Sequence, residues 1–174
     1  MRQPIPFDKF NTNIFHLWDK QWFLLTSGDF QANDYNTMTV AWGYFGMMCS
    51  KPTAVVVVRP VRHTYNFTEK HDTFTLCAFP EKYQDDLTIL GSKSGRDGNK
   101  IAETDLTVCK SKIITAPGFD QAELTIECKK SYWDDFKPEN FLDRTIEEKY
   151  PQKDYHRMYF GEILQINGTD KFLK

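Results

Sequence analysis

The feature that most limits the possible folds is an apolar run, Thr53-Ala54-Val55-Val56-Val57-Val58. β-Branched valine favours the extended conformation, and four in succession place apolar side chains on both faces of a strand. A strand of this kind is buried on both faces. Pro60 has no amide hydrogen for ladder pairing, so we expect the strand to end close to it. The rest of the fold therefore has to cover this strand from both sides.

Several other segments have extended character. Trp22 to Gly28 is rich in aromatic and aliphatic residues, and Thr37 to Tyr44 alternates with a period of two. We expect the segment that begins at Asn36 to pair with the valine strand as a hairpin, across a turn at Cys49 to Pro52. Further strands are predicted at Thr73–Phe79, Lys112–Ala116, Ala122–Lys130 and His156–Asn167.

Short helices are predicted between these strands. Thr64 suits the N-cap of a helix through Lys70, Pro80 suits the start of a helix over residues 81–90, and Asp97 is placed to cap a short helix. Residues 1–20 and 131–154 are predicted to be irregular. This order lacks the βαβ rhythm of a parallel sheet and favours a closed or partly closed antiparallel barrel. A barrel with a packed interior binds ligands at a rim or an interface.

Composition limits the class of protein. With 174 residues, 40% hydrophobic and 15% aromatic, the chain is expected to form one globular domain over residues 1–174. Its net charge of −2 gives no basic excess for nucleic acid or an anionic membrane. We find no apolar stretch of membrane-spanning length and no signal peptide, so we expect a cytoplasmic protein. The four cysteines and four histidines lack metal-binding spacing.

Two segments concentrate groups that bind anions. Arg59-Pro60-Val61-Arg62-His63-Thr64 follows the valine strand, and if it stays extended, Arg62 and Thr64 point from one face toward a shared anion. The alternative is that these arginines are solvated groups at the end of a strand. The glycine-rich loop 91–100 lacks the spacing of a P-loop and suits either a solvated turn or an anion contact. Its potential donors are Ser92, Lys93, Ser94, Arg96 and Lys100.

The segment Asn36-Thr37-Met38-Thr39 has two interpretations. It is either an ordinary strand with Met38 in the core, or a strand that lies against a flat heteroaromatic ring. In the second case backbone amides and threonine hydroxyls meet the polar edge of the ring, with Met38 or Trp42 near its apolar part. We assign no catalytic residue, because G-x-S-x-G and paired carboxylates are both absent.

Taken in order, these segments resemble the flavin reductase-like family, and within it the flavoredoxin branch. The resemblance extends from residue 18 to residue 168 and implies an FMN-binding split barrel of antiparallel Greek-key topology. It also implies a homodimer with one FMN per subunit near the subunit interface. The motifs that carry it are Asn36–Gly43, Lys51-Pro52, Arg59–Thr64, Ser94-Gly95-Arg96-Asp97 with Lys100, and His156–Ile163.

The resemblance also implies cofactor contacts and an activity. The isoalloxazine and ribityl chain would contact Asn36, Thr37, Met38 and Thr39, with Trp42 nearby. The phosphate would be held by Arg62 and Thr64, helped by Arg59 or His63. The phosphate or ring environment would be completed by Ser94, Arg96 and Lys100. Phe172 would close over the flavin. FMN carries the redox step in such proteins. We therefore expect an NAD(P)H:FMN oxidoreductase, or an electron carrier that serves a partner protein; the alternative is a non-catalytic barrel that carries or senses FMN or another small molecule.

Overall fold

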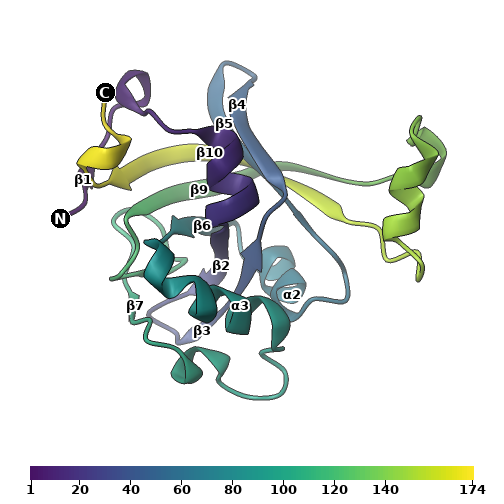
Figure 1. Cartoon of the computed structure of the whole chain (residues 1–174), viewed down its shortest axis with the longest axis horizontal. Coiled ribbons are helices and arrows are strands. Elements are labelled where there is room, and N and C mark those ends of the chain that lie inside the picture. Colours follow the sequence, from purple (N-terminus) through teal and green to yellow (C-terminus); the bar gives the residue numbers. More distant parts are fainter.

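The computed structural model describes all residues from Met1 to Lys174 and has a curled antiparallel sheet at its centre, with short helices around it (Figure 1). The main sheet has the strand order β3-β2-β6-β9-β10-β5-β4, and β1 pairs with β10 beside it. β7 and β8 form a separate two-stranded sheet. The strands are β1 (Gln3–Pro4), β2 (Phe23–Asp29), β3 (Asp34–Val40), β4 (Gly43–Met48), β5 (Lys51–Val58), β6 (Thr73–Ala78), β7 (Val108–Cys109), β8 (Gly118–Phe119), β9 (Leu124–Asp135) and β10 (Arg157–Gly168).

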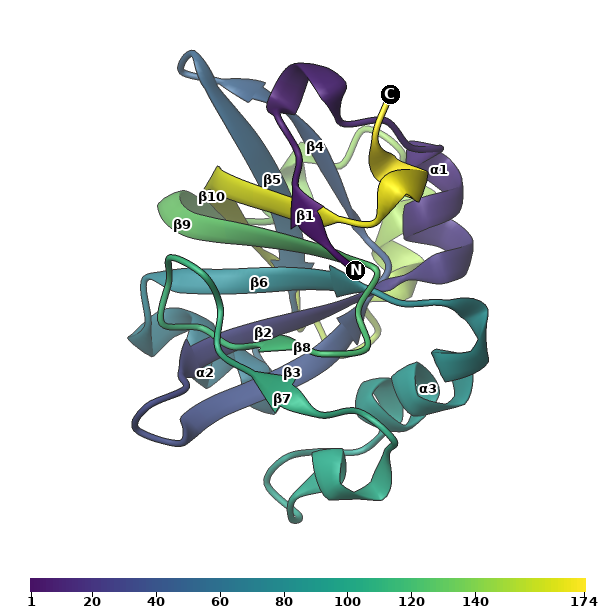
Figure 2. The ribbon, with the colours of Figure 1, turned by 90° about the vertical axis from the view of Figure 1, so that its left-hand side faces the viewer.

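The helices are short. Figure 2 shows α3 beyond the β2–β3 side of the sheet and β1 beside β10. The α-helices are α1 (Ile14–His16), α2 (His63–Lys70) and α3 (Gln84–Ser92). A single π-turn spans Leu17–Gln21, and 3₁₀ turns span Phe7–Lys9, Glu81–Tyr83, Lys100–Glu103, Pro138–Asn140, Arg144–Lys149 and Asp170–Phe172. None of the helices is long and apolar enough to cross a membrane.

The sheet is open between its two edge strands, β3 and β4, although these follow each other in the chain. Met38 and Val40 of β3 pack in the same apolar cluster as Ala54 and Val56 of β5, so both halves of the sheet enclose one core. The chain passes from one edge to the other through Ala41 and Trp42. This arrangement is a split barrel, as predicted.

The valine run forms β5 between β4 and β10, and its residues Val55, Val56 and Val58 are buried. The predicted hairpin is only partly correct. β5 pairs with β4 across Cys49-Ser50, whose φ angles of 50° and 62° suit a two-residue hairpin turn. β3, which contains Asn36, pairs with β2 instead. The alternating pattern over Thr37–Tyr44 continues across the passage at Ala41 and does not reveal that it spans two strands.

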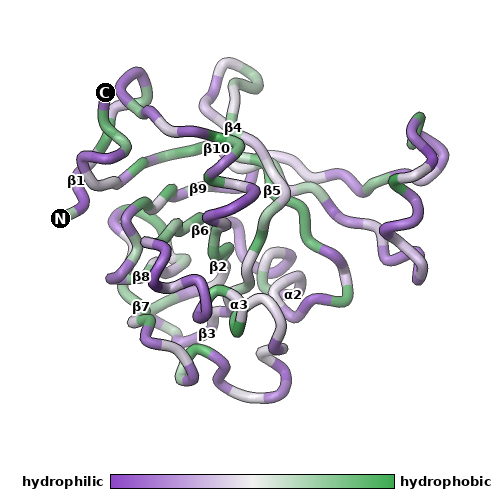
Figure 3. The backbone as a smooth tube through the Cα atoms, in the orientation of Figure 1, coloured by the Kyte–Doolittle hydropathy of each residue, from purple (hydrophilic) through white to green (hydrophobic).

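Two apolar clusters stabilise the fold. The larger fills the barrel, and the smaller packs Leu87 and Leu90 of α3 against the outside of the sheet around Leu24 and Phe79. Figure 3 shows hydrophobic colour concentrated on the barrel strands and hydrophilic colour over most of the segment that projects from β9 and β10. We call this projection, residues 136–156, the arm (Figure 1).

Three other predictions need correction. Residues 112–116 form bends rather than a strand, because the Glu127 carboxylate accepts the N–H groups of Lys112 and Ile113, each at 2.9 Å. The segment predicted to be irregular from residue 131 begins with the last part of β9, which continues to Asp135. The short helix predicted after Asp97 is a 3₁₀ turn over Lys100–Glu103 whose N-cap is Asn99.

Candidate functional site

The two predicted anion-binding segments meet in one cavity of about 150 Å³, which we call the anion pocket. Three of its cations, Arg62, Arg96 and Lys100, form no ion pair, whereas Lys93 pairs with Glu103. No carboxylate lines it, so its electrostatic potential favours a negative ligand. The lining residues are Asn36, Val61, Arg62, His63, Thr64, Ser92, Lys93, Ser94, Gly95, Arg96 and Lys100.

Arg62 and Thr64 reach the anion pocket by a route that differs from the predicted one. The segment does not stay extended, because Arg62 is the N-cap of α2 and Thr64 lies in its first turn. Thr64 therefore is not the N-cap, and the helix begins at His63. The first N–H groups of a helix have no partner within it, and together with the helix dipole they favour anions. The start of α2 adds these backbone donors to the two side chains.

The loop after α3 is held against the start of α2 by arginines from both segments. The Arg62 guanidinium donates to the Gly91 carbonyl, and Nη1 of Arg96 donates to the Val61 carbonyl at 2.9 Å. Lys100 is only 4% exposed, and its Nζ donates to the carbonyls of Leu90 at 2.7 Å and Lys93 at 3.1 Å. Arg62, Arg96 and Lys100 are thus bonded to neutral carbonyls, which leaves their charges uncompensated.

Burial, and after it the neighbouring positive charge, perturbs the titration of these groups. Burial, and then the charge of Arg62, lowers the pKa of Lys100 to about 8. Burial lowers the pKa of His63 below its usual value, and the charges of Arg96 and Lys100 lower that pKa further. The pKa of Arg62 is lowered by burial and by Arg59. A bound anion would reverse the repulsion that contributes to each of these shifts.

Two polar side chains complete the wall of the anion pocket. Nδ2 of Asn36 donates to Oγ1 of Thr64 at 2.7 Å, which ties β3 to α2. Nδ1 of His63 is buried and has no hydrogen-bond partner in the protein. Because buried polar atoms are nearly always paired, an orphaned nitrogen beside several cations fits a site that a ligand completes.

The remaining predicted residues of β3 use their side chains within the protein. Oγ1 of Thr37 donates to the Leu25 carbonyl at 3.1 Å, Met38 is in the barrel core, and Oγ1 of Thr39 donates to the Leu87 carbonyl. β3 is an edge strand, so its unpaired backbone groups face outward. A contact between a flavin ring and Thr37–Thr39 therefore stays a prediction, and it concerns the backbone rather than the hydroxyl groups.

Like Thr37, Met38 and Thr39, three further predicted residues lie outside the anion pocket. Phe172 is 1% exposed and stacks on Phe10 in the barrel core, and its closure over a flavin stays a prediction. Arg59 binds the arm, with Nη1 at 3.1 Å from Asp154 and Nη2 donating to the Lys149 carbonyl at 2.7 Å. Trp42 is 47% exposed and lies apart from the pocket.

The sequence analysis did not find the cluster at the base of the arm. The Trp42 ring lies 5.1 Å from that of His156, whose Nδ1 is 2.7 Å from the Tyr150 hydroxyl. Burial, and then the nearby Arg59, lowers the pKa of His156 to about 4, so the imidazole is neutral at pH 7. The arm brings these groups together from positions with no shared motif, and Trp42, Arg59 and His156 each belong to a motif that the sequence analysis named separately.

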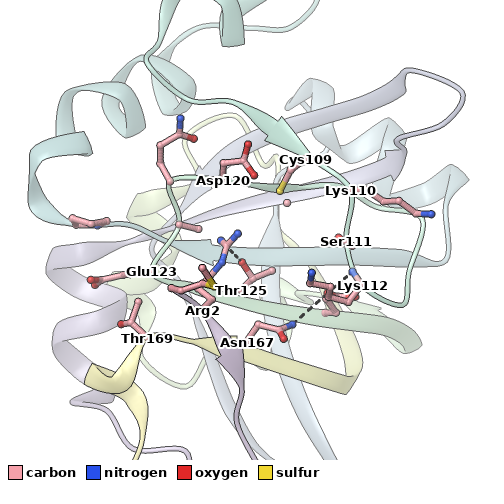
Figure 4. A pocket seen from close by; sticks show the side chains of 16 residues that line it. Arg2, Cys109, Lys110, Ser111, Lys112, Asp120, Glu123, Thr125, Asn167 and Thr169 are labelled. Carbon is pink, nitrogen blue, oxygen red and sulfur yellow. Dashed lines mark hydrogen bonds between the residues drawn. The ribbon is translucent and has the colours of Figure 1, made fainter.

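A larger cavity of about 530 Å³ lies between β7, β8, β9 and the N-terminus (Figure 4). It contains none of the predicted residues, and charges of both signs line it. Nη1 of Arg2 donates hydrogen bonds to the Phe119 carbonyl at 2.7 Å and to Oγ1 of Thr125 at 2.9 Å. Glu123 forms an ion pair with Lys171 at 2.6 Å. Charges of mixed sign do not define an anion site here.

The fold and the anion pocket together define a split-barrel protein with a cationic site beside an open sheet edge. The model of the flavin reductase like domain family matches residues 20–170, and the chain belongs to this family. No curated protein matches the chain.

Solved structures share the fold over nearly the whole chain. An FMN-binding domain of a flavin reductases-like enzyme from Shewanella baltica OS155 is 18% identical with a TM-score of 0.68, over 97% of this chain and 77% of that one. Flavoredoxin of Desulfovibrio vulgaris (Miyazaki F) is 21% identical with a TM-score of 0.66, over 94% and 76%. Flavoredoxin from Methanosarcina acetivorans is 19% identical with a TM-score of 0.69, over 95% and 77%. The predicted split-barrel fold is thereby confirmed.

Proposed function

We propose that this protein binds FMN and passes electrons through it, in the manner of a flavin reductase or a flavoredoxin. The observation that carries the proposal is the anion pocket, where Arg62, Arg96 and Lys100 meet the start of α2 without any carboxylate. Membership of the flavin reductase-like family supports it, as do neighbours described as an FMN-binding domain and as flavoredoxins.

The residues present fit the cofactor. Arg62, Arg96, Thr64 and the first amides of α2 would hold the phosphate, and His63 Nδ1 would gain a partner. The free edge of β3 begins at the same pocket, since Asn36 lines it. In this proposal the backbone of Thr37–Thr39 orients the ribityl chain and the ring. When bound, FMN supplies two-electron redox chemistry, and the protein supplies binding and orientation.

In this proposal the electrons come from NAD(P)H or a partner protein, and the protein acts in the cytoplasm. All four cysteines are free thiols, which suits a reducing compartment. β3 has no strand neighbour on one side, and the proposal places the flavin ring along this edge, where a donor would meet it. The anion pocket itself is small and already accounts for one phosphate group.

The proposal includes a homodimer. Strand register aligns Tyr44, Val55, Phe160 and Tyr132 in one row across β4, β5, β10 and β9. The two tyrosines at the ends of this row are 52% and 54% exposed, and Met47, Met48 and Trp133 are exposed near it. An apolar row of this extent on a sheet face suits a protein contact. Sedimentation velocity tests this part, and a monomer at micromolar concentration would contradict it.

The function is tested with the purified protein. An absorbance spectrum and titrations with FMN measure binding, and addition of NADH and then NADPH without oxygen measures bleaching of the bound flavin. We expect micromolar or tighter FMN binding and reduction by one nucleotide. Absence of FMN binding would refute the proposal. Binding without reduction by either nucleotide or by a low-potential partner protein would favour a carrier or sensor.

A further inference from the structure

We propose that the arm of each subunit clasps the outer sheet face of a second copy of this chain, so that two copies hold each other by exchanged arms. The inference rests on the homodimer that is part of the proposed function, and it goes further by naming the two surfaces that meet. One surface is acidic and lies on the arm. The other is basic and lies on the face of the sheet that points away from the barrel core.

The arm projects beyond one end of β9 and β10 and carries exposed apolar side chains (Figure 1). Leu142 is 97% exposed, and Ile146 is 38% exposed. The arm is nevertheless packed at its base, because Tyr150 is buried, stacks on Phe141 and has its hydroxyl 2.7 Å from Nδ1 of His156. A packed projection that leaves apolar side chains in solvent suits a contact with another protein surface.

The same part of the arm is negatively charged. Residues 138–148 contain four carboxylates and one cation, Arg144, which leaves a net charge of −3. The carboxylates form no ion pair with the rest of the chain. They belong to Glu139, Asp143, Glu147 and Glu148. We call residues 138–148 the acidic surface, and its charge favours a basic partner surface.

A basic surface with apolar side chains is present on the same chain. Lys110, Lys112 and Lys129 line one hollow of about 560 Å³, and none of the three forms an ion pair. Ile113 and Leu164 line the same hollow and are 55% and 37% exposed. We call these five residues the basic patch. It has the charge opposite to that of the acidic surface and the same combination of charged and apolar groups.

The carboxylates around the basic patch leave it positive. Asp29 is the one acidic residue that lines the hollow, and its Oδ1 accepts the N–H of Gln31 at 2.8 Å. Glu162 lies opposite Lys129 in the strand register, but its ion pair is with Lys51 at 2.6 Å. Three lysines against one unpaired carboxylate keep a positive potential, which an acidic surface would compensate.

The strand register places the two surfaces at opposite ends of one sheet face. Phe160 pairs with Tyr132 and Glu162 pairs with Lys129, so Lys129 points to the same face as the apolar row that ends at Tyr132. The arm follows Asp135, six residues beyond Lys129, which is about 20 Å along the strand. The apolar row of the proposed homodimer thus lies between the basic patch and the arm.

This spacing explains why the occupant is a second copy. The arm and the basic patch are fixed at opposite ends of the same strands, so an arm does not reach its own patch. A two-fold axis that crosses the strands at the apolar row exchanges the two ends of the face. Each arm then meets the basic patch of the other copy, and the same contact forms twice.

The test reverses the charges of one surface at a time. The arm variant carries Glu139→Lys, Asp143→Lys and Glu148→Lys. The patch variant carries Lys110→Glu, Lys112→Glu and Lys129→Glu. Sedimentation velocity at low salt measures the dimer dissociation constant. We expect each variant alone to dimerise at least about tenfold more weakly than the wild type, because both contacts of its dimer have like charges.

A mixture of the two variants gives the sharper result. In a mixed pair both arms meet a patch of opposite charge, so the heterodimer should form about as tightly as the wild-type dimer. Native mass spectrometry identifies it by its mass. The matched control carries three reversals of the same size around α3, where no contact is proposed, and should stay dimeric. These reversals are Glu81→Lys, Asp85→Lys and Asp105→Lys.

A single substitution covers the case in which a triple variant does not fold. Leu142 is almost fully exposed, so Leu142→Ser leaves the core intact and should weaken the dimer at least about threefold. An unchanged dissociation constant in this variant would contradict the contact. Circular dichroism spectra show whether each variant keeps its fold.

The remaining outcomes separate this inference from the proposed function. Dimers that persist in both triple variants, or a mixture that forms no heterodimer, would overturn the exchange of arms and leave the homodimer in place. Dissociation of the control variant would attribute the effect to net charge and also overturn the inference. A monomeric wild type would refute the homodimer and the exchange of arms together, whereas FMN titration of that protein tests the redox function independently.

Discussion

Replacement of Arg62 by alanine tests whether the anion pocket holds a phosphate. Arg62 is half-buried, has no carboxylate partner and donates to the Gly91 carbonyl. The substitution removes one charge-assisted contact to the ligand, worth about 1.5–3 kcal/mol, and loosens the loop that carries Arg96. A loss of this size corresponds to roughly a 10-fold to 150-fold weaker affinity for FMN.

The assay is titration of wild-type and variant proteins with FMN and with riboflavin, which lacks the phosphate. Riboflavin affinity should change by less than about threefold, because the guanidinium has no other part of the flavin to bind. Arg59→Ala is the matched control, since Arg59 is three residues away and binds Asp154 and the Lys149 carbonyl. It should leave the affinity for FMN close to that of the wild type.

Two outcomes would refute this reasoning. An equal loss of FMN and riboflavin affinity in Arg62→Ala would mean that the residue supports the structure and does not bind the phosphate. A larger loss in Arg59→Ala than in Arg62→Ala would move the phosphate toward the arm. Circular dichroism spectra of both variants show whether the fold is retained.

Three further predictions concern stability. Burial lowers the pKa of Lys100 to about 8 in the folded protein, so the unfolded chain binds more protons between that pKa and the usual 10.5. The free energy of unfolding of the ligand-free wild type, measured by urea denaturation relative to Lys100→Met, should therefore rise as pH increases through this window. A decline in this relative stability would contradict the lowered pKa. Phe172→Ala should lower the free energy of unfolding by about 3–5 kcal/mol in the same assay, and weaker flavin binding at unchanged stability would instead support the predicted lid. Gly43→Ala would place a Cβ against the Val55 carbonyl and the Trp18 ring and should lower Tm, whereas Gly46→Ala, with nothing within 4 Å, should not; equal Tm values would contradict the packing.

Local chemistry was enough to predict part of the fold. The four valines identify the buried strand β5, and the spacing of apolar residues locates β2, β6 and β10. The alternation over Thr37–Tyr44 misses the change of sheet edge at Ala41, because a period of two describes one strand as well as two in succession. The strand predicted at Lys112–Ala116 fails because its backbone hydrogen bonds go to the side chain of Glu127, which is remote in sequence.

The candidate site was predictable in composition more than in geometry. Arg62 and Thr64 do line one cavity, but a helix start brings them together and an extended strand does not; their binding of an anion stays a prediction. The loop 91–100 joins them because of its long-range contacts with Gly91 and Val61. Both of these hydrogen bonds end on backbone carbonyls, which have no signature in residue type.

The hydrogen bonds that Arg62 and Arg96 make across the anion pocket affect how the pocket can change during evolution. Arg62 comes from one wall and binds a carbonyl of the other, and Arg96 does the reverse. The two walls are thus tied to each other by side-chain hydrogen bonds, and we expect the pocket to behave as one cooperative unit. A substitution at either arginine alters both halves at once, and we expect the pair to be inherited or lost jointly among related chains.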